Sequence, residues 1–469
     1  MTSMLSTVLN NAAKFDNGDE SQRERHFQTL KESLHKKLIG GMDLSIVRKL
    51  DPEWLHEEIR RGAEDLCKIE GYLLSTAERA QLVDELIYET LGFGPLEPLL
   101  ADPTVSDILI NGPHTVYVER RGQLERTNIR FRDLNHLLGI LHRIANRVGR
   151  RIDEASPMVD ARLPDGGRLN AIIRPLALEG ALVSIRRFGE SPLSAGDLVA
   201  RKSASTEMIE FLAACVKARL NIIISGGTGS GKTTLLNALS ANIPETERVV
   251  TIEDAAELQL QLPHLGRLET RPANLEGKGE ITARELLRNA LRMRPDRIII
   301  GECRGIEAFE MLNAMNTGHD GGMTTIHAND TRDAIGRLEM LIAMAAPELP
   351  IWFIHKRIAS AIHIIVQTAR LSGGVRRITQ ISEITGTEGE LISMHDIFKF
   401  RQTGIDSNGV ATGNFESTGM RLQCMHRLIA AGIQLPSKIF DRGSNEFDKL
   451  DPFGYKLQTK RMKPGNFES

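Results

Sequence analysis

The feature that most constrains this chain is an eight-residue run that satisfies the pattern G-x-x-x-x-G-K-[ST] in full. Its residues are Gly226, Gly227, Thr228, Gly229, Ser230, Gly231, Lys232 and Thr233. An apolar run, 222–224, precedes it and an apolar-faced segment, 234–239, follows it, which predicts a strand, a loop and a helix. In such a loop, backbone N–H groups close around phosphate oxygens and the helix N-terminus adds partial positive charge. The sequence therefore predicts a binding site for ATP or GTP.

The side chains at the end of this loop have separate predicted tasks. Lys232 is expected to contact the β- and γ-phosphates, and the Thr233 hydroxyl is expected to bind Mg²⁺, which bridges the same phosphates. Thr234 extends the nucleotide-binding residues into the helix. The alternative is a glycine-rich turn that matches the pattern by accident, and the flanking strand and helix argue against it.

Acidic residues follow two further apolar runs, and both runs are expected to end at the edge of the sheet that carries the phosphate loop. The first run leads into Glu253, Asp254 and Glu257, and the second leads into Glu302. ATP hydrolysis needs one carboxylate to orient or deprotonate water and others to hold Mg²⁺ through its water shell, here Glu253 and Asp254. Solvated acids at strand ends are the alternative, and only the preceding phosphate loop favours the catalytic interpretation.

Two histidines, His319 and His327, occur in the run TGHDGGMTTIHAND. They are eight residues apart in the sequence with no third ligand nearby, which makes a poor metal site. Each fits a hydrogen-bonding residue of the core, and each also fits a loop that senses the γ-phosphate. Their spacing leaves both interpretations open.

Composition and pattern organise the rest of the chain. A formal charge of −2 gives no global argument for nucleic-acid binding, and four separated cysteines argue against disulfides or zinc. No segment has the pattern of a signal peptide or a membrane span, so we expect a cytoplasmic protein with peripheral membrane contact at most. The predicted units are a disordered arm or tether at 1–28, a helical bundle at 29–91, an α+β domain at 92–188, a linker at 189–205, a nucleotide-binding domain at 206–440 and a disordered tail at 441–469.

Four motifs in a fixed order carry a resemblance to a known superfamily. They are the phosphate loop, the acidic box TIEDAAE, the strand end IIIGE and the His box TGHDGGMTTIH. In this order they resemble the ATPases of type II secretion, type IV pili and type IV secretion. The longer segments IEDAAELQLQLPHLGRLETRPANLEGKGEIT and LRNALRMRPDRIIIGE are similar to the CpaF/TadA branch, which powers Flp-type (tight adherence, Tad) pili.

The resemblance implies the fold class α/β, with a RecA-like P-loop ATPase domain preceded by a small α+β (PAS-like) domain and an N-terminal helical bundle. It implies a homohexameric ring with ATP and Mg as cofactors. The implied partners are inner-membrane platform proteins (TadB/TadC-like), with pilin reached indirectly and no nucleic acid. The implied location is the cytoplasm, peripherally associated with the inner membrane.

The resemblance also assigns catalytic residues. Glu257 matches the glutamate that activates water, Glu302 takes the Walker B position, and His319 and His327 fall on the His box. The box is one residue longer than in pilus-retraction relatives, which puts the role of His319 in doubt. The family's N-terminal domain presents arginines to the nucleotide, and the matching residues are Arg162, Arg168 and Arg186. The alternative for these three is a set of surface arginines on a hairpin.

Three rival functions remain on the sequence alone. The first is a type IV secretion traffic ATPase that moves protein or DNA. The second is a nucleic-acid translocase on the same core, although an aromatic content of 4% offers few stacking residues. The third is a nucleotide-gated scaffold without turnover, which the intact acidic residues disfavour.

Overall fold

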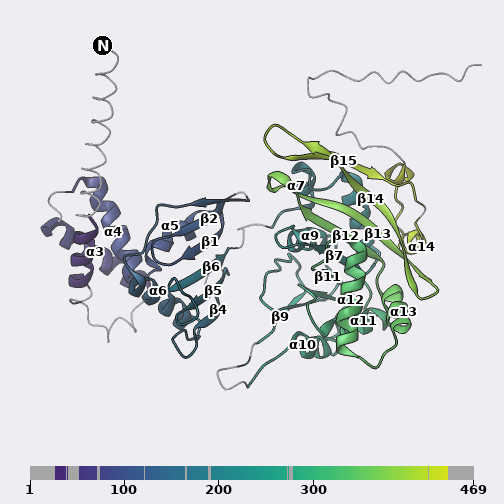
Figure 1. Ribbon diagram of the computed structural model, residues 1–469, viewed down its shortest axis with the longest axis horizontal. Coiled ribbons are helices and arrows are strands. Elements are labelled where there is room, and N and C mark those ends of the chain that lie inside the picture. Colours follow the sequence, from purple (N-terminus) through teal and green to yellow (C-terminus); the bar gives the residue numbers. More distant parts are fainter. Residues whose placement is uncertain are drawn as a thin grey trace, which may run out of the picture. The chain divides into compact units, whose positions relative to one another are not determined.

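The computed structural model describes residues 27–38, 40, 52–70, 74–120, 122–163, 166–187, 192–271, 273, 278–420 and 422–441. The chain divides into two compact units, Met1–Gly189 and Glu190–Ser469 (Figure 1). The arm predicted at 1–28 lies outside the described residues except for 27–28, which begin a helix that runs to residue 38. The tail predicted at 441–469 lies outside them except for Asp441.

The first unit begins with helices, as expected for the N-terminal region. The helix at 27–38 is followed by α3 (Pro52–Glu70) and α4 (Thr76–Thr90). A capping box starts α4, because the Ser75 side chain accepts from the Glu78 N–H while the Glu78 carboxylate accepts from the Ser75 N–H. The apolar sides of these helices pack into one core, which includes Leu34, Ile59, Leu82 and Leu86.

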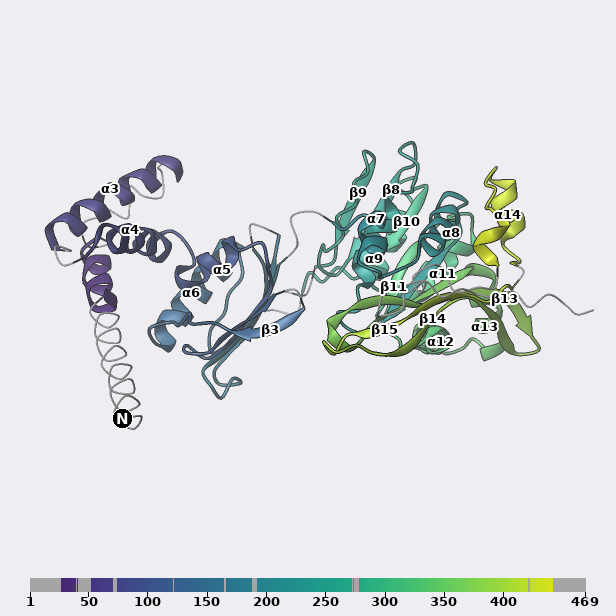
Figure 2. The same ribbon diagram turned by 90° about the horizontal axis from the view of Figure 1, so that it is seen from above.

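The rest of the first unit is a six-stranded antiparallel sheet in the order β3-β2-β1-β6-β5-β4. Its strands are β1 (Val105–Asn111), β2 (Val116–Arg120), β3 (Gln123–Arg126), β4 (Met158–Arg162), β5 (Arg168–Ile173) and β6 (Ala181–Arg186). Buried and exposed residues alternate along β4 and β6, so one face packs against α5 (Glu97–Ala101) and α6 (Leu134–Arg147) (Figure 2). The opposite face carries the exposed side chains.

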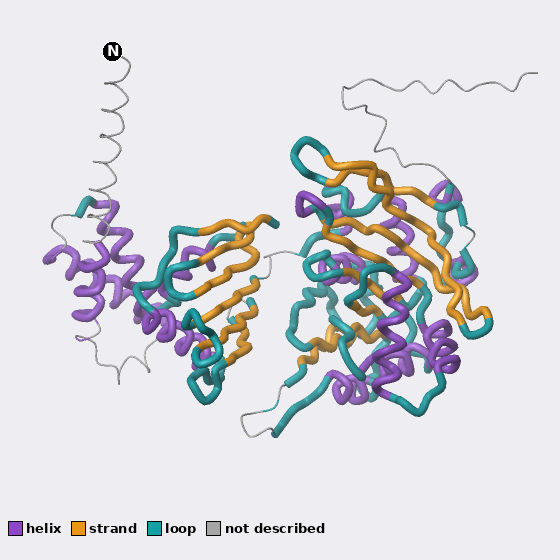
Figure 3. Tube along the Cα trace, viewed as in Figure 1, coloured by secondary structure: helices purple, strands orange, loops and turns teal. Residues whose placement is uncertain are grey.

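The second unit is built on a nine-stranded sheet in the order β15-β14-β13-β12-β7-β11-β10-β8-β9. The strands from β12 to β9 in this order run parallel, and β13, β14 and β15 are added antiparallel at one side. The strands are the orange segments of the tube in Figure 3. The strands are β7 (Ile222–Gly226), β8 (Val249–Glu253), β9 (Leu265–Glu269), β10 (Arg297–Ile300), β11 (Met323–Ile326), β12 (Ile364–Arg370), β13 (Arg376–Glu388), β14 (Leu391–Ile405) and β15 (Ala411–Ser417). The apolar runs of the sequence thus become buried parallel strands.

Helices cover both faces of this sheet (Figure 2). One side carries α7 (Ala195–Ala200), α8 (Thr206–Lys217) and α9 (Lys232–Ser240), and the short α14 (Met425–Ala430) joins the same core. The other side carries α10 (Ala283–Ala290), α11 (Glu307–Asn316), α12 (Thr331–Ala345) and α13 (Ile351–Ala361). This arrangement confirms the predicted α/β class and its RecA-like nucleotide-binding domain.

The structure differs from the linker predicted at 189–205. Helix α7 lies inside that range and starts with a capping box formed by Ser194 and Asp197. Leu198 and Ala204 are buried in the core of the second unit, and Ser205 caps α8. The small polar residues that look like a linker therefore serve as helix caps, so most of this segment is part of the second unit.

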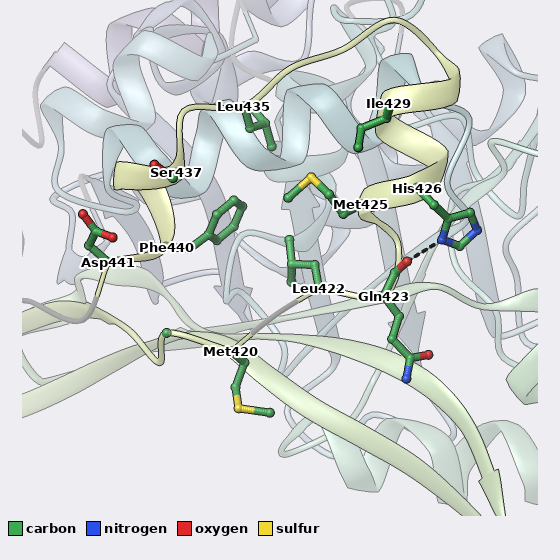
Figure 4. A pocket seen from close by; sticks show the side chains of 11 residues that line it. Met420, Leu422, Gln423, Met425, His426, Ile429, Leu435, Ser437, Phe440 and Asp441 are labelled. Carbon is green, nitrogen blue, oxygen red and sulfur yellow. Dashed lines mark hydrogen bonds between the residues drawn. The ribbon is translucent and has the colours of Figure 1, made fainter.

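Among the described residues, no helix has the length and apolar character needed to cross a membrane. A cavity of about 630 Å³ lies near the end of the described chain, between α14 and the segment that follows it (Figure 4). Its walls include Met420, Leu422, Met425, Ile429 and Phe440. None of the residues predicted to bind nucleotide lines this cavity.

Candidate active site

The phosphate loop connects the end of β7 to the start of α9 and depends on glycine conformations. Gly229 and Gly231 have φ values of 68° and 97°. This left-handed region is accessible to glycine because it has no Cβ atom to clash with the backbone. Gly226 is constrained by space as well, because a Cβ there would lie 2.4 Å from the Thr368 carbonyl oxygen and 2.5 Å from Ser230 Oγ. The motif glycines thus allow the loop to curve tightly between the strand and the helix.

Lys232 places its ammonium group inside the curve of this loop. The residue is only 7% exposed, and Nζ donates to the carbonyl oxygens of Gly226 and Gly227 at 3.0 Å each. The same Nζ lies 3.3 Å from His327 Nε2. Thr233 and Thr234 follow in the first turn of α9, both half-buried. The loop therefore gathers a buried cation, two hydroxyl side chains and a helix N-terminus at one place.

Glu302 lies at the end of β10 on the same sheet edge. Its Oε2 accepts from Arg304 Nη2 at 2.6 Å, and its Oε1 lies 3.0 Å from His327 Nε2. Burial acts to raise the pKa of Glu302, but Arg304, His327 and Lys232 outweigh it and hold that pKa below its ordinary value. Glu302 is therefore ionised at neutral pH.

His327 follows β11 and lies between Lys232 and Glu302. Burial, and then the charge of Lys232, lower the pKa of His327, so the ring is neutral near pH 7. His327 Nε2 faces both groups, and the tautomer of the ring decides whether it accepts from Lys232 or donates toward Glu302. Glu302 Oε1 is buried and has no assigned hydrogen bond, although it is near the ring.

The acidic box after β8 is held together by Glu253. This residue is 4% exposed, and its Oε2 accepts from the backbone N–H groups of Glu257 and Leu258 at 2.7 Å each. Burial raises the pKa of Glu253, and the two backbone bonds only partly oppose that effect. Because Glu253 Oε2 accepts both of these backbone hydrogen bonds, Glu253 holds the acidic-box loop in its conformation.

Arg304 was missed by sequence reasoning and links the predicted carboxylates. Its pKa is raised first by the hydrogen bond to Glu302, and then by the charges of Glu302, Asp254 and Glu257. The distance from Arg304 Nη1 to Asp254 Oδ2 is 3.9 Å. The structure thus brings two of the predicted acidic residues, Glu302 and Asp254, to one guanidinium. Only the position of Arg304, two residues after the strand-end glutamate, signals this in the sequence.

His319 is the predicted residue that the structure does not bring to the phosphate loop. It precedes β11 whereas His327 follows that strand, so the two histidines lie toward opposite ends of β11. The backbone N–H of His319 donates to the Ala314 carbonyl at 3.2 Å, and its Nδ1 is buried without a hydrogen-bond partner. The geometry places only His327 beside Lys232.

The three predicted arginines form a row on the first unit. Arg162 ends β4, Arg168 begins β5 and Arg186 ends β6, and the strands pair Arg162 with Arg168 and Arg168 with Arg186. Directly paired residues share one face of an antiparallel sheet, and these lie on the face opposite the core. Arg168 also contacts Asp160 at 3.4 Å. We name these three residues the arginine row.

The site and fold define a P-loop enzyme, with a phosphate loop after β7 and an acidic residue, Glu302, after the nearby strand β10. Comparison with known proteins then gives its family: residues 89–399 match the family described as Type II/IV secretion system protein, and the chain belongs to that family. A Mycobacterium tuberculosis protein, named provisionally as a conjugal transfer protein, is 40% identical over 309 residues, covering 65% of this chain and 87% of that protein.

Two further comparisons are similar in extent. A Bordetella bronchiseptica protein named as a homolog of the type IV secretion system protein PtlH is 36% identical, covering 60% of this chain and 91% of that protein. The crystal structure of the VirB11 ATPase from the Brucella suis type IV secretion system, with sulphate, is 28% identical and covers 61% of this chain and 91% of that one, with a TM-score of 0.34. Its membership of the Type II/IV secretion family, whose members are ATPases, makes this chain an ATPase.

Proposed function

We propose that this chain is the motor ATPase of a Flp/Tad-type type IV pilus, which hydrolyses ATP with Mg to drive pilus assembly, with retraction as a further candidate activity of the same motor. The single observation that carries the catalytic part is the position of His327 at one sheet edge, where its Nε2 lies 3.3 Å from Lys232 Nζ and 3.0 Å from Glu302 Oε1. The segments similar to the CpaF/TadA branch support the pilus part.

The residues around the loop suit an ATP phosphate tail. Lys232 supplies a buried positive charge to the β- and γ-phosphates, and the loop N–H groups supply donors. Glu257, in the box fixed by Glu253, orients the attacking water and accepts its proton. His327, neutral and next to Lys232, reports whether the γ-phosphate is present. Asp254 stays a predicted member of the site, whereas His319, which precedes β11, is not assigned to it.

The donor set also suits Mg²⁺. Glu302 Oε1 is a buried carboxylate oxygen without a hydrogen-bond partner, and Thr233 offers a hydroxyl in the first turn of α9. Among the described residues no group of three or more His, Cys, Asp or Glu side chains could hold a metal ion by itself. Mg²⁺ is usually held by one or two protein oxygens together with substrate phosphates and water, and Glu302 and Thr233 offer two such oxygens. When bound, it neutralises charge that develops on the phosphates.

The proposed working form is a homohexamer at the cytoplasmic side of the inner membrane, acting on TadB/TadC-like platform proteins and through them on pilin. The arginine row concentrates positive charge on an exposed sheet face, and we propose that it binds nucleotide phosphate. No nucleic-acid substrate is part of this proposal.

A second candidate is a traffic ATPase of type IV secretion, and the relatives favour it. Those reported above are named for conjugal transfer and for type IV secretion. A deletion strain separates the two candidates: the pilus motor predicts loss of surface pilin with secretion unchanged, and complementation by Lys232→Ala should fail. Loss of protein or DNA export with normal pili would support the second candidate instead.

A further inference from the structure

The hairpin between β12 and β13 reaches over the phosphate loop. Thr368 on β12 pairs with Gly226, and Thr368 Oγ1 lies 2.9 Å from Ser230 Oγ, so β12 continues past the end of β7 alongside the loop. Two residues further on, Arg370 ends β12 and pairs with Arg376, the first residue of β13. Paired residues share one face of the hairpin, so both arginines project at the same point.

Both arginines lie at the loop. Arg376 Nε donates to the Gly229 carbonyl oxygen at 2.8 Å. A Cβ placed on Gly229 would lie 3.8 Å from Arg370 Nη1, and one placed on Gly231 would lie 3.5 Å from Arg376 Cδ. Both side chains are exposed, so a bound molecule can reach their guanidinium groups.

The sheet order indicates which end of a nucleotide these arginines face. In the order β12-β7-β11-β10, the β7 loop has His327 and Glu302 on one side, at the ends of β11 and β10. Lys232 Nζ contacts His327, so the γ-phosphate end lies toward that side. The hairpin lies on the other side of β7, where the α-phosphate and the nucleoside extend.

We propose that Arg370 and Arg376 form a guanidinium clamp for the nucleoside end of the nucleotide held by the phosphate loop. This inference rests on the proposed ATP site and adds a recognition element that its motifs do not contain. A guanidinium plane stacks on a purine and donates to ribose oxygens, and it keeps its charge at every physiological pH. Through the contact with Gly229, the clamp also couples nucleoside binding to the shape of the loop.

The test compares a ligand that carries a nucleoside with an inorganic phosphate chain that carries none. Dissociation constants for ADP and for inorganic tripolyphosphate, each with Mg²⁺, are measured by titration calorimetry on the full chain for wild type, Arg370→Gln and Arg376→Gln. Each arginine variant should bind ADP about tenfold more weakly and tripolyphosphate within about twofold of wild type. Arg401→Gln is the matched control, because Arg401 is an exposed arginine on β14 whose side chain contacts Glu416 at 4.0 Å.

Each outcome bears on the clamp. Unchanged ADP affinity in both variants would overturn it, and so would an equal loss for ADP and tripolyphosphate, because that result assigns the arginines to the phosphates or to support of the loop. If wild type binds ADP but not tripolyphosphate, the nucleoside supplies most of the binding free energy. The clamp is then supported if the variants lose ADP affinity and overturned if they do not. Lys232→Ala separates the two proposals: if it binds both ligands like wild type, the phosphate-loop site itself fails.

Discussion

Two glutamates at the ends of neighbouring strands look alike in the sequence and differ in the structure: Glu253 is the last residue of β8, and Glu302 lies two residues after β10. The strands pair in parallel, Ile252 beside Ile300, so both acids arrive at one edge of the sheet. Glu253 accepts from backbone N–H groups of its own loop and has a raised pKa. Glu302 contacts Arg304, lies near His327 and has a lowered pKa.

The difference shows that the role of a strand-end carboxylate depends on its partners. Backbone partners make Glu253 a brace for the acidic box, and charged side chains make Glu302 an ionised group beside the phosphate loop. Glu302 was predicted to be catalytic and Glu253 to hold Mg²⁺ through its water shell, and the sequence carries no signal that Glu253 instead braces its own loop. The predictions below test that separation.

The largest effect is expected on the Glu302 side, from Lys232→Ala. This change removes the buried ammonium that contacts the loop carbonyls and His327, and with it the charge for the phosphates. Steady-state phosphate release should fall by at least about 100-fold. Circular dichroism and the melting temperature serve as controls for folding, and turnover near the wild-type rate in a folded variant would refute the assigned site.

On the Glu253 side, Glu253→Ala should act on stability. It leaves the N–H groups of Glu257 and Leu258 without their acceptor in a buried place. We expect the free energy of unfolding of the second unit to fall by about 2–4 kcal/mol in denaturant titrations. Glu253→Gln is the matched variant, because its amide oxygen can accept the same two hydrogen bonds, and it should lose less than about 1 kcal/mol. Equal losses in the two variants would show that these hydrogen bonds are not what Glu253 contributes to stability.

The contrast can be sharpened through Arg304. Arg304→Gln removes the hydrogen bond and the charge that lower the pKa of Glu302. The acid limb of the pH–rate profile for ATP hydrolysis should therefore move to higher pH, because Glu302 then takes up its proton at higher pH. A profile that keeps its acid limb in place would mean that Glu302 ionisation does not limit turnover.

The smallest effect is expected in the pH dependence of folding stability, which should have opposite signs for the two glutamates. Both acids have an ordinary pKa of 4.5. Because the pKa of Glu302 is lowered, its stabilising contribution is present above pH 4.5 and is lost as the pH falls through the folded value. Because the pKa of Glu253 is raised, its contribution is present below pH 4.5 and is lost as the pH rises through the folded value. Unfolding curves of Glu302→Gln and Glu253→Gln across pH should differ from wild type in these separate windows.

Sequence reasoning reached the phosphate loop and the parallel strands because both depend on contiguous residues. It predicted that Glu302 follows a strand at the edge that carries the phosphate loop, because parallel strands deliver their following residues to one edge. It read α7 as a linker, since the caps Ser194 and Ser205 have the composition of a loop. A local pattern shows neither how a helix packs nor which backbone N–H groups a capping side chain satisfies.

Other site residues could not be predicted because they depend on strand order. Thr368 and Arg376 meet the phosphate loop only because β12 lies next to β7, some 140 residues away in the chain. The two histidines of one motif were grouped by sequence distance, yet β11 runs between them. The partners of Arg304 likewise come from the ends of two different strands.

The most direct test of the account is phosphate release measured side by side for Glu302→Gln and Glu253→Gln, with ADP affinity measured on the same preparations. The account predicts that Glu302→Gln binds ADP like wild type and hydrolyses ATP at least about 100-fold more slowly. Glu253→Gln should retain turnover within a few-fold of wild type, because its amide preserves the bonds that shape the box. Equal loss of turnover in the two variants, or normal turnover in Glu302→Gln, would contradict the account.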